Sequence, residues 1–145
     1  MTYPKEHVAA FVAGQLGFER GFDAYTALGF GEPLVAGVIY HNWNPEAGVI
    51  ELSAASSGRD WLTRERLRQV FGYPFDQLEC QMCVARISEG NARARRIWKA
   101  IGASEYIIPR LRGPREAEVI ATLTVETWLA FERKTHGKIT SARAA

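Results

Sequence analysis

Residues 91–102 form the segment that most limits what this chain can fold into. Asn91 is typical of a helix N-cap, because its side-chain oxygen can accept from the orphan amides of the first turn. Gly102 is typical of the position just past the end of a helix. Apolar residues recur at helical spacing and define one face: Ala94, Ile97, Trp98 and Ile101. The segment predicts a short helix whose N-terminus, with arginines nearby, can hold an anionic ligand.

The rest of the chain predicts a mixed fold of helices and strands. We expect helices over residues 5–16 and 60–71, with Asp60 as the cap of the second. Strands are expected over residues 22–30, 34–40, 49–55, 78–87 and 104–111, with a last strand that spans 118–129 at most. This order, a three-stranded meander followed by alternating helices and strands, indicates an α/β (α+β) fold with a mostly antiparallel twisted sheet flanked by helices. We expect one domain over residues 1–131 and a basic, flexible tail over residues 132–145.

The composition argues against several classes of protein. A net charge of +2 does not favour nucleic-acid binding, and no apolar run reaches the ~18 residues of a membrane helix. No secretory signal is expected at the N-terminus. Cys80 and Cys83 have the spacing of redox or metal pairs, but residues three apart on a strand lie on opposite faces. We therefore expect two structural cysteines and a reducing, cytoplasmic location.

The pattern Asn-x-x-Ala-x-x-Ile-aromatic-x-x-x-Gly over residues 91–102 resembles the motif B helix of the GNAT acyltransferases. The order of elements over roughly residues 5–129 is also similar to the GNAT core from its second strand onward, so the family's first strand is expected to be missing. The resemblance implies acetyl-CoA as cosubstrate, no metal, and direct transfer of the acetyl group to an amine in a ternary complex. The short front of the chain looks like that of small GNAT proteins encoded by phages and prophages.

The resemblance places Glu51 on the strand where many family members carry a general base. Such a group is needed because an amine with a pKa of about 10.4 must lose a proton before it can attack a thioester. The alternative is an ordinary glutamate on the solvent side of a strand. The residues that follow it, Leu52, Ser53 and Ala54, are expected to bind the coenzyme.

The segment after this strand occupies the place of the family's pyrophosphate loop. Its glycines normally let backbone amides close on the phosphates at a helix start. Here Arg59 fits the first position of the loop, but Leu62 and Arg64 stand where glycines belong. Either the loop still holds the pyrophosphate, with arginines replacing part of the amide nest, or tight coenzyme binding has been lost. The first outcome gives the predicted coenzyme residues Arg59, Asp60, Trp61, Leu62, Thr63 and Arg64.

On the motif B helix, the resemblance assigns Asn91 to the pantetheine arm of the coenzyme, with a purely structural cap as the alternative. Arg93, Ala94 and Arg96 are expected near the same ligand. Trp98 stands where the family usually has a tyrosine that protonates the leaving thiolate. An indole N–H only donates hydrogen bonds, so Trp98 either packs in the core or contacts the coenzyme. Either no side chain protonates the thiolate, or Tyr106, the candidate general acid, or another residue does.

The predicted function is an acetyl-CoA-dependent N-acetyltransferase acting on a primary amine. The alternatives are a degenerate GNAT-fold protein that binds a partner, or a nucleic-acid-associated member that modifies a base. A homodimer is expected, as is the absence of membrane contact. The three histidines, His7, His41 and His136, have no metal or triad spacing.

Overall fold

The computed structural model describes residues 3–17, 24–58 and 60–144, with side chains as far as residue 135. The chain divides into two compact units, Met1–Cys80 and Gln81–Ala145, and each is described by itself. Within the described residues, four α-helices and six strands confirm the predicted mixed fold, and the strands pair in antiparallel fashion inside both units. No strand precedes the first helix in the described part.

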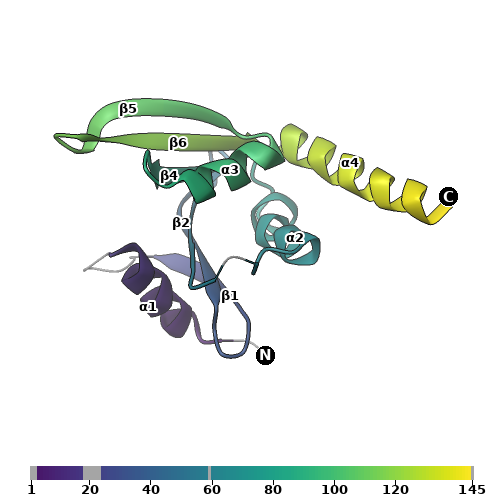
Figure 1. Cartoon of the computed structure of the whole chain (residues 1–145), viewed down its shortest axis with the longest axis horizontal. Helices are drawn as coiled ribbons and strands as arrows, with labels where there is room; N and C mark the ends of the chain where they lie inside the picture. The colour runs from purple at the N-terminus through teal and green to yellow at the C-terminus, as the bar shows by residue number, and fades with distance from the viewer. Residues whose placement is uncertain (1–2, 18–23, 59, 145) are drawn as a thin grey trace. The chain divides into compact units, whose positions relative to one another are not determined.

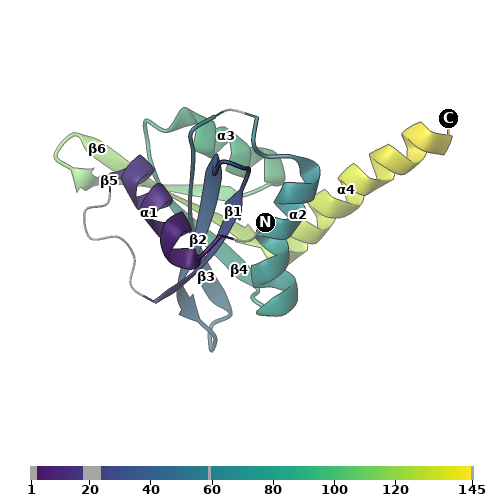
Figure 2. The same cartoon turned by 90° about the horizontal axis from the view of Figure 1, so that it is seen from below.

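The first unit is a three-stranded meander with a helix on each face. It contains α1 (Lys5–Leu16), β1 (Tyr25–Phe30), β2 (Ala36–Asn44), β3 (Val49–Ser56), α2 (Arg64–Gly72) and a π-helical turn, η1 (Tyr73–Gln77). The strands pair in the order β1-β2-β3. Figures 1 and 2 show α1 and α2 on opposite sides of β2.

Alternation along β2 explains this arrangement, because successive side chains point to opposite faces of a strand. Ile39 packs with Val8 and Val12 of α1, whereas the hydroxyl of Tyr40 donates to the carbonyl of Val70 in α2 at 2.5 Å. The approach of α1 needs Gly37, since a Cβ there would lie 2.8 Å from γ-carbons of both valines.

The second unit is built on a central strand. It contains β4 (Met82–Ser88), α3 (Ala92–Ile101), β5 (Ser104–Gly113), β6 (Glu116–Thr124) and α4 (Val125–Ala144), with β6 between β4 and β5. The side chains of Ala85, Ile87, Val119 and Ala121 form a core that Ala94 and Trp98 of α3 cover. One face of this three-stranded sheet is therefore apolar and packed against a helix.

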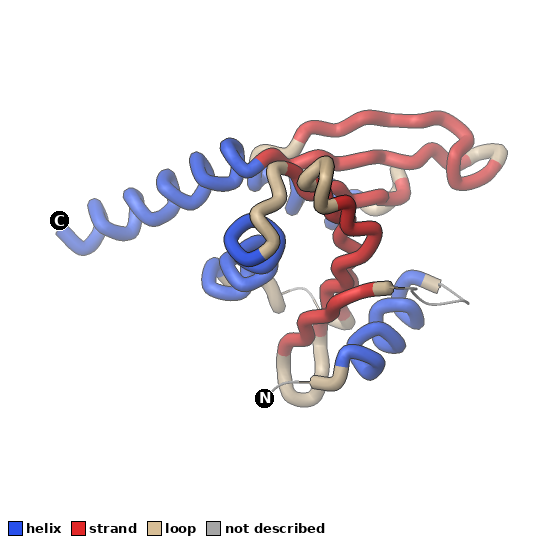
Figure 3. The backbone as a smooth tube through the Cα atoms, turned by 180° about the vertical axis from the view of Figure 1, so that it is seen from behind, coloured by secondary structure: helices blue, strands red, loops and turns tan. Residues whose placement is uncertain are grey.

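The prediction of a strand over residues 118–129 is wrong from Val125 onward, where α4 begins directly after β6 (Figure 3). Thr124 starts the helix, because its hydroxyl accepts from the amide of Thr127 at 3.2 Å. Trp128 is buried and stacks on Phe131 with ring centroids 5.8 Å apart. The backbone stays helical to Ala144, and the flexible tail over residues 132–145 remains a prediction.

Other boundaries differ by a few residues. The second helix begins at Arg64 rather than near residue 60, and Thr63 rather than Asp60 caps it through a 3.1 Å bond from the amide of Arg66. The strand expected over residues 78–87 is β4, Met82–Ser88. Residues 22 and 23 of the expected first strand lie outside the described residues.

Candidate active site

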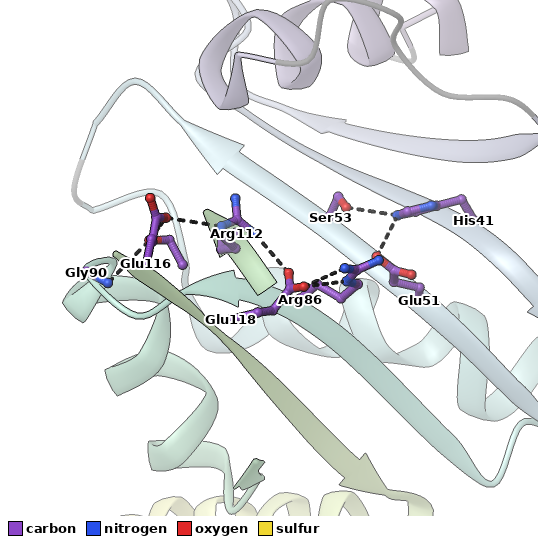
Figure 4. Close-up of polar contacts among 9 residues, drawn as sticks. His41, Glu51, Ser53, Arg86, Gly90, Arg112, Glu116 and Glu118 are labelled. Atoms are coloured by element: carbon purple, nitrogen blue, oxygen red, sulfur yellow. Dashed lines mark hydrogen bonds and ion pairs between the residues drawn. The ribbon is translucent and has the colours of Figure 1, made fainter. Parts of the chain in front are cut away.

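Glu51 lies at the centre of a polar cluster in the first unit (Figure 4). It is directly opposite His41 in the β2–β3 register, and its side chain is 16% exposed. The side-chain amide of Asn42 donates to its Oε1 at 3.0 Å, and the Nε2 of His41 lies 3.6 Å from its Oε2. The same Nε2 is 2.8 Å from the hydroxyl oxygen of Ser53. The predicted base is therefore in contact with a histidine and an amide.

A bulge in β2 builds this cluster. The register between β2 and β3 shifts between His41 and Asn44, and Asn42 has a left-handed backbone with φ of 51°. Asparagine tolerates this conformation better than most residues with a side chain. Consecutive strand residues normally point to opposite faces, but here His41 and Asn42 both reach Glu51. A bulge next to an active site commonly redirects a side chain in this way.

The strand residues predicted beside the coenzyme are split between two faces. Ser53 pairs with Ile39 and lies on the α1 face with His41. Leu52 pairs with Tyr40, is buried, and faces the side that α2 covers. Ala54 is exposed. Ser53 is thus the member of this trio that joins the Glu51 cluster.

The turn before α2 carries the other predicted coenzyme residues of the first unit. Trp61 packs on Phe30 with ring centroids 5.5 Å apart, and its carbonyl accepts from the guanidinium of Arg66 at 2.8 Å. Thr63 caps α2, and Arg64 is exposed at the first helical position. Asp60 is exposed and Leu62 is half-buried, whereas Arg59 lies outside the described residues. This bond from Arg66 ties the turn to the first part of α2.

In the second unit, α3 begins as the sequence predicts. The Oδ1 of Asn91 accepts from the amide of Ala94 at 3.1 Å, so the cap is present, and Gly102 ends the helix with φ of 111°. Arg93 is half-buried and Arg96 exposed. Arg95, by contrast, makes a two-pronged ion pair with Glu105 at 3.0 and 3.1 Å. That bond lowers the pKa of Glu105 and fastens α3 to β5.

Trp98 and Tyr106 lie on opposite faces of the second sheet. Trp98 packs on the core that contains Ala121, and Ala121 pairs with Glu105, so Glu105 shares the α3 face. Tyr106 is the next residue, pairs with Ile120, and is 58% exposed. Trp98 therefore packs in the core, which is one of the two roles predicted for it. Tyr106 lies on the other face, and its role as a general acid stays a prediction.

A second polar cluster surrounds Glu118, whose side chain is 2% exposed. Arg86 donates to its Oε2 from Nε at 3.0 Å and from Nη2, and Arg112 donates to its Oε1 at 2.9 Å (Figure 4). Burial opposes the ionised carboxylate most strongly, but the bonds and charges of the two arginines outweigh it and lower the pKa of Glu118. Sequence reasoning missed this cluster, although alternation along β6 places Glu118 away from the apolar face.

Both cysteines are buried, and neither forms a disulfide. Burial raises the pKa of the Cys80 thiol, more than the hydrogen bond with Trp43 lowers it. Among the residues that the structure describes, no group of three His, Cys, Asp or Glu side chains could hold a metal ion, and no helix could cross a membrane. The cytoplasmic location stays a prediction.

No family model and no curated protein matches the sequence. Solved structures do match. A protein of T. thermophilus assigned as an acetyltransferase superposes on 89% of this chain and 72% of its own, with 17% identity and a TM-score of 0.68. A GCN5-related N-acetyltransferase from Brucella melitensis covers 69% of this chain and 49% of its own, with 17% identity and a TM-score of 0.57. The fold is that of the GNAT acetyltransferases.

A mutant form of the spermidine/spermine N-acetyltransferase of Vibrio cholerae shares the GNAT fold. It covers 67% of this chain and 60% of its own, with 13% identity and a TM-score of 0.59. The GNAT fold expected from the sequence is therefore confirmed. At these identities the likeness concerns the fold, and the roles of individual residues remain predictions.

Proposed function

We propose that this chain is an acetyl-CoA-dependent N-acetyltransferase that transfers an acetyl group to a primary amine. The observation that carries the proposal is the GNAT fold, shared over 89% of the chain with a protein assigned as an acetyltransferase. The Glu51 cluster supports it, because a half-buried carboxylate beside a histidine is suited to handling the proton of an ammonium. We propose that the amine attacks the thioester directly, without a covalent acetyl-enzyme intermediate.

The residues present are chemically suited to acetyl-CoA. Thr63 and Asn91 each cap a helix whose N-terminus favours negative charge, and Arg64 stands exposed at the start of α2. We propose that the amides and arginine at the start of α2 hold the pyrophosphate, in place of the missing glycines. Asn91 is proposed to contact the pantetheine arm as well as capping α3.

Isothermal titration with acetyl-CoA tests this function, with desulfo-CoA and ATP as comparison ligands. We expect binding of the first two in the micromolar range, as is common for enzyme substrates, and much weaker binding of ATP. Two variants separate the roles of Asn91. Asn91→Ala removes the cap and costs about 1 kcal/mol of stability, whereas Asn91→Ser keeps a capping oxygen. If Asn91 contacts the coenzyme through its amide, both variants bind acetyl-CoA more weakly.

Binding that Asn91→Ser leaves intact would reduce Asn91 to a cap. No heat at millimolar acetyl-CoA would refute the proposed function. Where binding is found, acceptors are screened by release of free thiol, beginning with spermidine and short primary amines. Spermidine comes first because a structure with the same fold is a spermidine/spermine N-acetyltransferase.

We also propose that the chain forms a homodimer through β5. This strand carries exposed large apolar side chains: Tyr106, Ile107, Ile108 and Leu111. Exposed large apolar side chains gathered on one strand are a common feature of protein interfaces. Light scattering during gel filtration should give twice the 16.2 kDa chain mass, and Ile107→Lys should return the protein to a monomer. A monomeric wild type at high concentration would refute the dimer.

A further inference from the structure

Two side chains of consecutive residues hold the carboxylate of Glu51, one on each oxygen. Asn42 lies 3.0 Å from Oε1 and His41 lies 3.6 Å from Oε2. This arrangement depends on the left-handed backbone of Asn42, a conformation that is uncommon outside glycine. Backbone outliers that persist near polar clusters justify a hypothesis of function. The bulge therefore adds Asn42 to the carboxylate that His41 already faces in regular register, and the three side chains together form part of the candidate active site.

The hydrogen-bond partners assign the protons in this cluster. A carboxylate only accepts, so the nitrogen of the Asn42 side chain must face Glu51. That nitrogen also lies 3.4 Å from the Nδ1 of His41, and since an amide nitrogen only donates, Nδ1 is the nitrogen without a proton. The imidazole proton is then on Nε2, between the hydroxyl of Ser53 and the carboxylate of Glu51. The Nε2–H of His41 thus lies on the side of the Glu51 carboxylate, and its basic Nδ1 lies on the opposite side of the ring.

Charged and titratable groups near His41 come from three elements. Glu51 faces it from β3, and Tyr25 pairs with it from β1. From α1, the ammonium of Lys5 lies 4.9 Å from the ring centroid of Tyr25. Burial lowers the pKa of His41, and the charge of Glu51 raises it by a smaller amount. At neutral pH His41 is therefore an uncharged base beside a carboxylate.

We propose that His41 is the proton acceptor of this site and that Glu51 is its charge partner, an inference that rests on the proposed acetyl transfer. An N–H bond of the acceptor's ammonium breaks and its proton bonds to Nδ1, while Asn42 releases that nitrogen and stays on Glu51. The amine keeps the electron pair and becomes able to attack the thioester. Glu51 remains ionised and stabilises the imidazolium, as a carboxylate does for the histidine of a catalytic triad.

The first measurement is an NMR pH titration of the imidazole signals. His7→Gln and His41→Gln assign them among the three histidines. We expect His41 to titrate below its usual range, and Glu51→Gln to move its midpoint to still lower pH, because the stabilising charge is lost. A His41 midpoint that Glu51→Gln leaves unchanged would overturn the charge pairing. This readout needs no substrate.

The second measurement is kcat/KM for acetyl transfer against pH, with the best amine from the acceptor screen. We expect kcat/KM to rise with pH at the midpoint that NMR gives for His41, and Glu51→Gln to move both midpoints together. His41→Gln should lower kcat/KM roughly 100-fold, the low end of general-base effects. The matched control is His7→Gln, an exposed histidine of α1, which should leave kcat/KM unchanged.

Asn42→Gly places at this position a residue that adopts a positive φ readily, and it removes the hydrogen bond that the side-chain amide of Asn42 donates to Glu51. It should lower kcat/KM less than His41→Gln does, and circular dichroism confirms that each variant is folded. If His41→Gln keeps both the rate and the pH midpoint while Glu51→Gln loses activity, Glu51 alone is the base and this inference fails. A wild-type chain that binds no acetyl-CoA refutes the proposed function instead, and the proton-acceptor role falls with it.

Discussion

Glu51 and Glu118 are both strand glutamates with little solvent exposure, yet their partners differ in kind. Glu118 is held by two guanidinium groups, Arg86 and Arg112, which stay charged at any ordinary pH. Glu51 is held by a neutral amide and by an imidazole whose pKa burial lowers. The carboxylate of Glu118 is therefore paired with permanent charges, whereas that of Glu51 lies beside a neutral amide and an imidazole that can gain a proton.

This difference separates a structural charge from the one that we propose to be reactive. A carboxylate between two arginines is stabilised as an anion, so it resists taking up a proton. Glu118 therefore fastens β4, β5 and β6 together through side chains from all three strands. Glu51 lies beside a base whose charge can change, which is the requirement for moving a proton. Burial alone would favour Glu118 as the candidate catalytic residue, because it is the more buried of the two. The chemistry of the partners favours Glu51 instead.

The strongest way to break the comparison is to replace both glutamates by glutamine. Glu118→Gln should lower the free energy of unfolding by about 2 kcal/mol, because charge-assisted bonds are lost while the half-exposed arginines regain water. Glu51→Gln should cost less than about 1 kcal/mol, since the glutamine carbonyl can still accept from Asn42. Urea unfolding gives both values. Acetyl transfer should show the opposite order, with kcat/KM lowered by Glu51→Gln and unchanged by Glu118→Gln.

Arg86→Gln is the matched control for this pair. It leaves Arg112 on the Oε1 of Glu118, 2.9 Å away, so its effect should be smaller than that of Glu118→Gln. Equal destabilisation by Glu51→Gln and Glu118→Gln would mean that the two clusters are both structural.

A smaller effect, in the pH dependence of stability, should separate the two clusters again. The pKa of His41 is lower in the folded protein than the usual histidine value of about 6.5. Just below a pH of about 6.5 the unfolded chain therefore binds more protons than the folded protein does. Stability from this group is complete above that value and is lost as pH falls toward the folded pKa. The lowered pKa of Glu118 likewise gives stability above about 4.3, lost as pH falls through its own folded pKa.

Thermal melting between pH 8 and pH 3 measures both losses. His41→Gln should remove the loss that begins near neutral pH, whereas Glu118→Gln should reduce the loss in acid. Glu105, whose pKa Arg95 lowers, contributes to the acid loss in both variants and sets its remaining size. If His41→Gln left the melting profile above pH 5 unchanged, the loss of stability that begins near neutral pH would not come from His41.

The capping residue and the glycine of α3 predicted its ends well, because they act on backbone groups next to them in the chain. The cap at Asn91 and the glycine at 102 set α3 to within one residue, since both act on adjacent backbone groups. The end of β6 was missed because Val125 is β-branched and apolar, as a strand residue would be. Thr124, with Glu126 in the first turn, is a helix-start signal that could have corrected this.

The sequence singled out only those candidate-site residues that a family pattern assigns to a given position. Glu51 was singled out as a candidate because a resemblance placed it on a particular strand. His41 was passed over because its partner lies ten residues away across a hairpin, and Asn42 because a register shift brings it to the same carboxylate. Register shifts of this kind depend on backbone geometry at Asn42, and spacing along the chain does not show them.

Gly37 has a consequence for how this sequence can change over time. A single methyl group at this position would collide with both Val8 and Val12, so the distance of α1 from the sheet is set by an absent side chain. Positions 8, 12 and 37 should therefore vary together across homologous sequences. A lineage that acquires alanine at 37 is expected to carry a smaller residue at 8 or 12, and the helix that stands over the Glu51 face of β2 and β3 would otherwise be displaced.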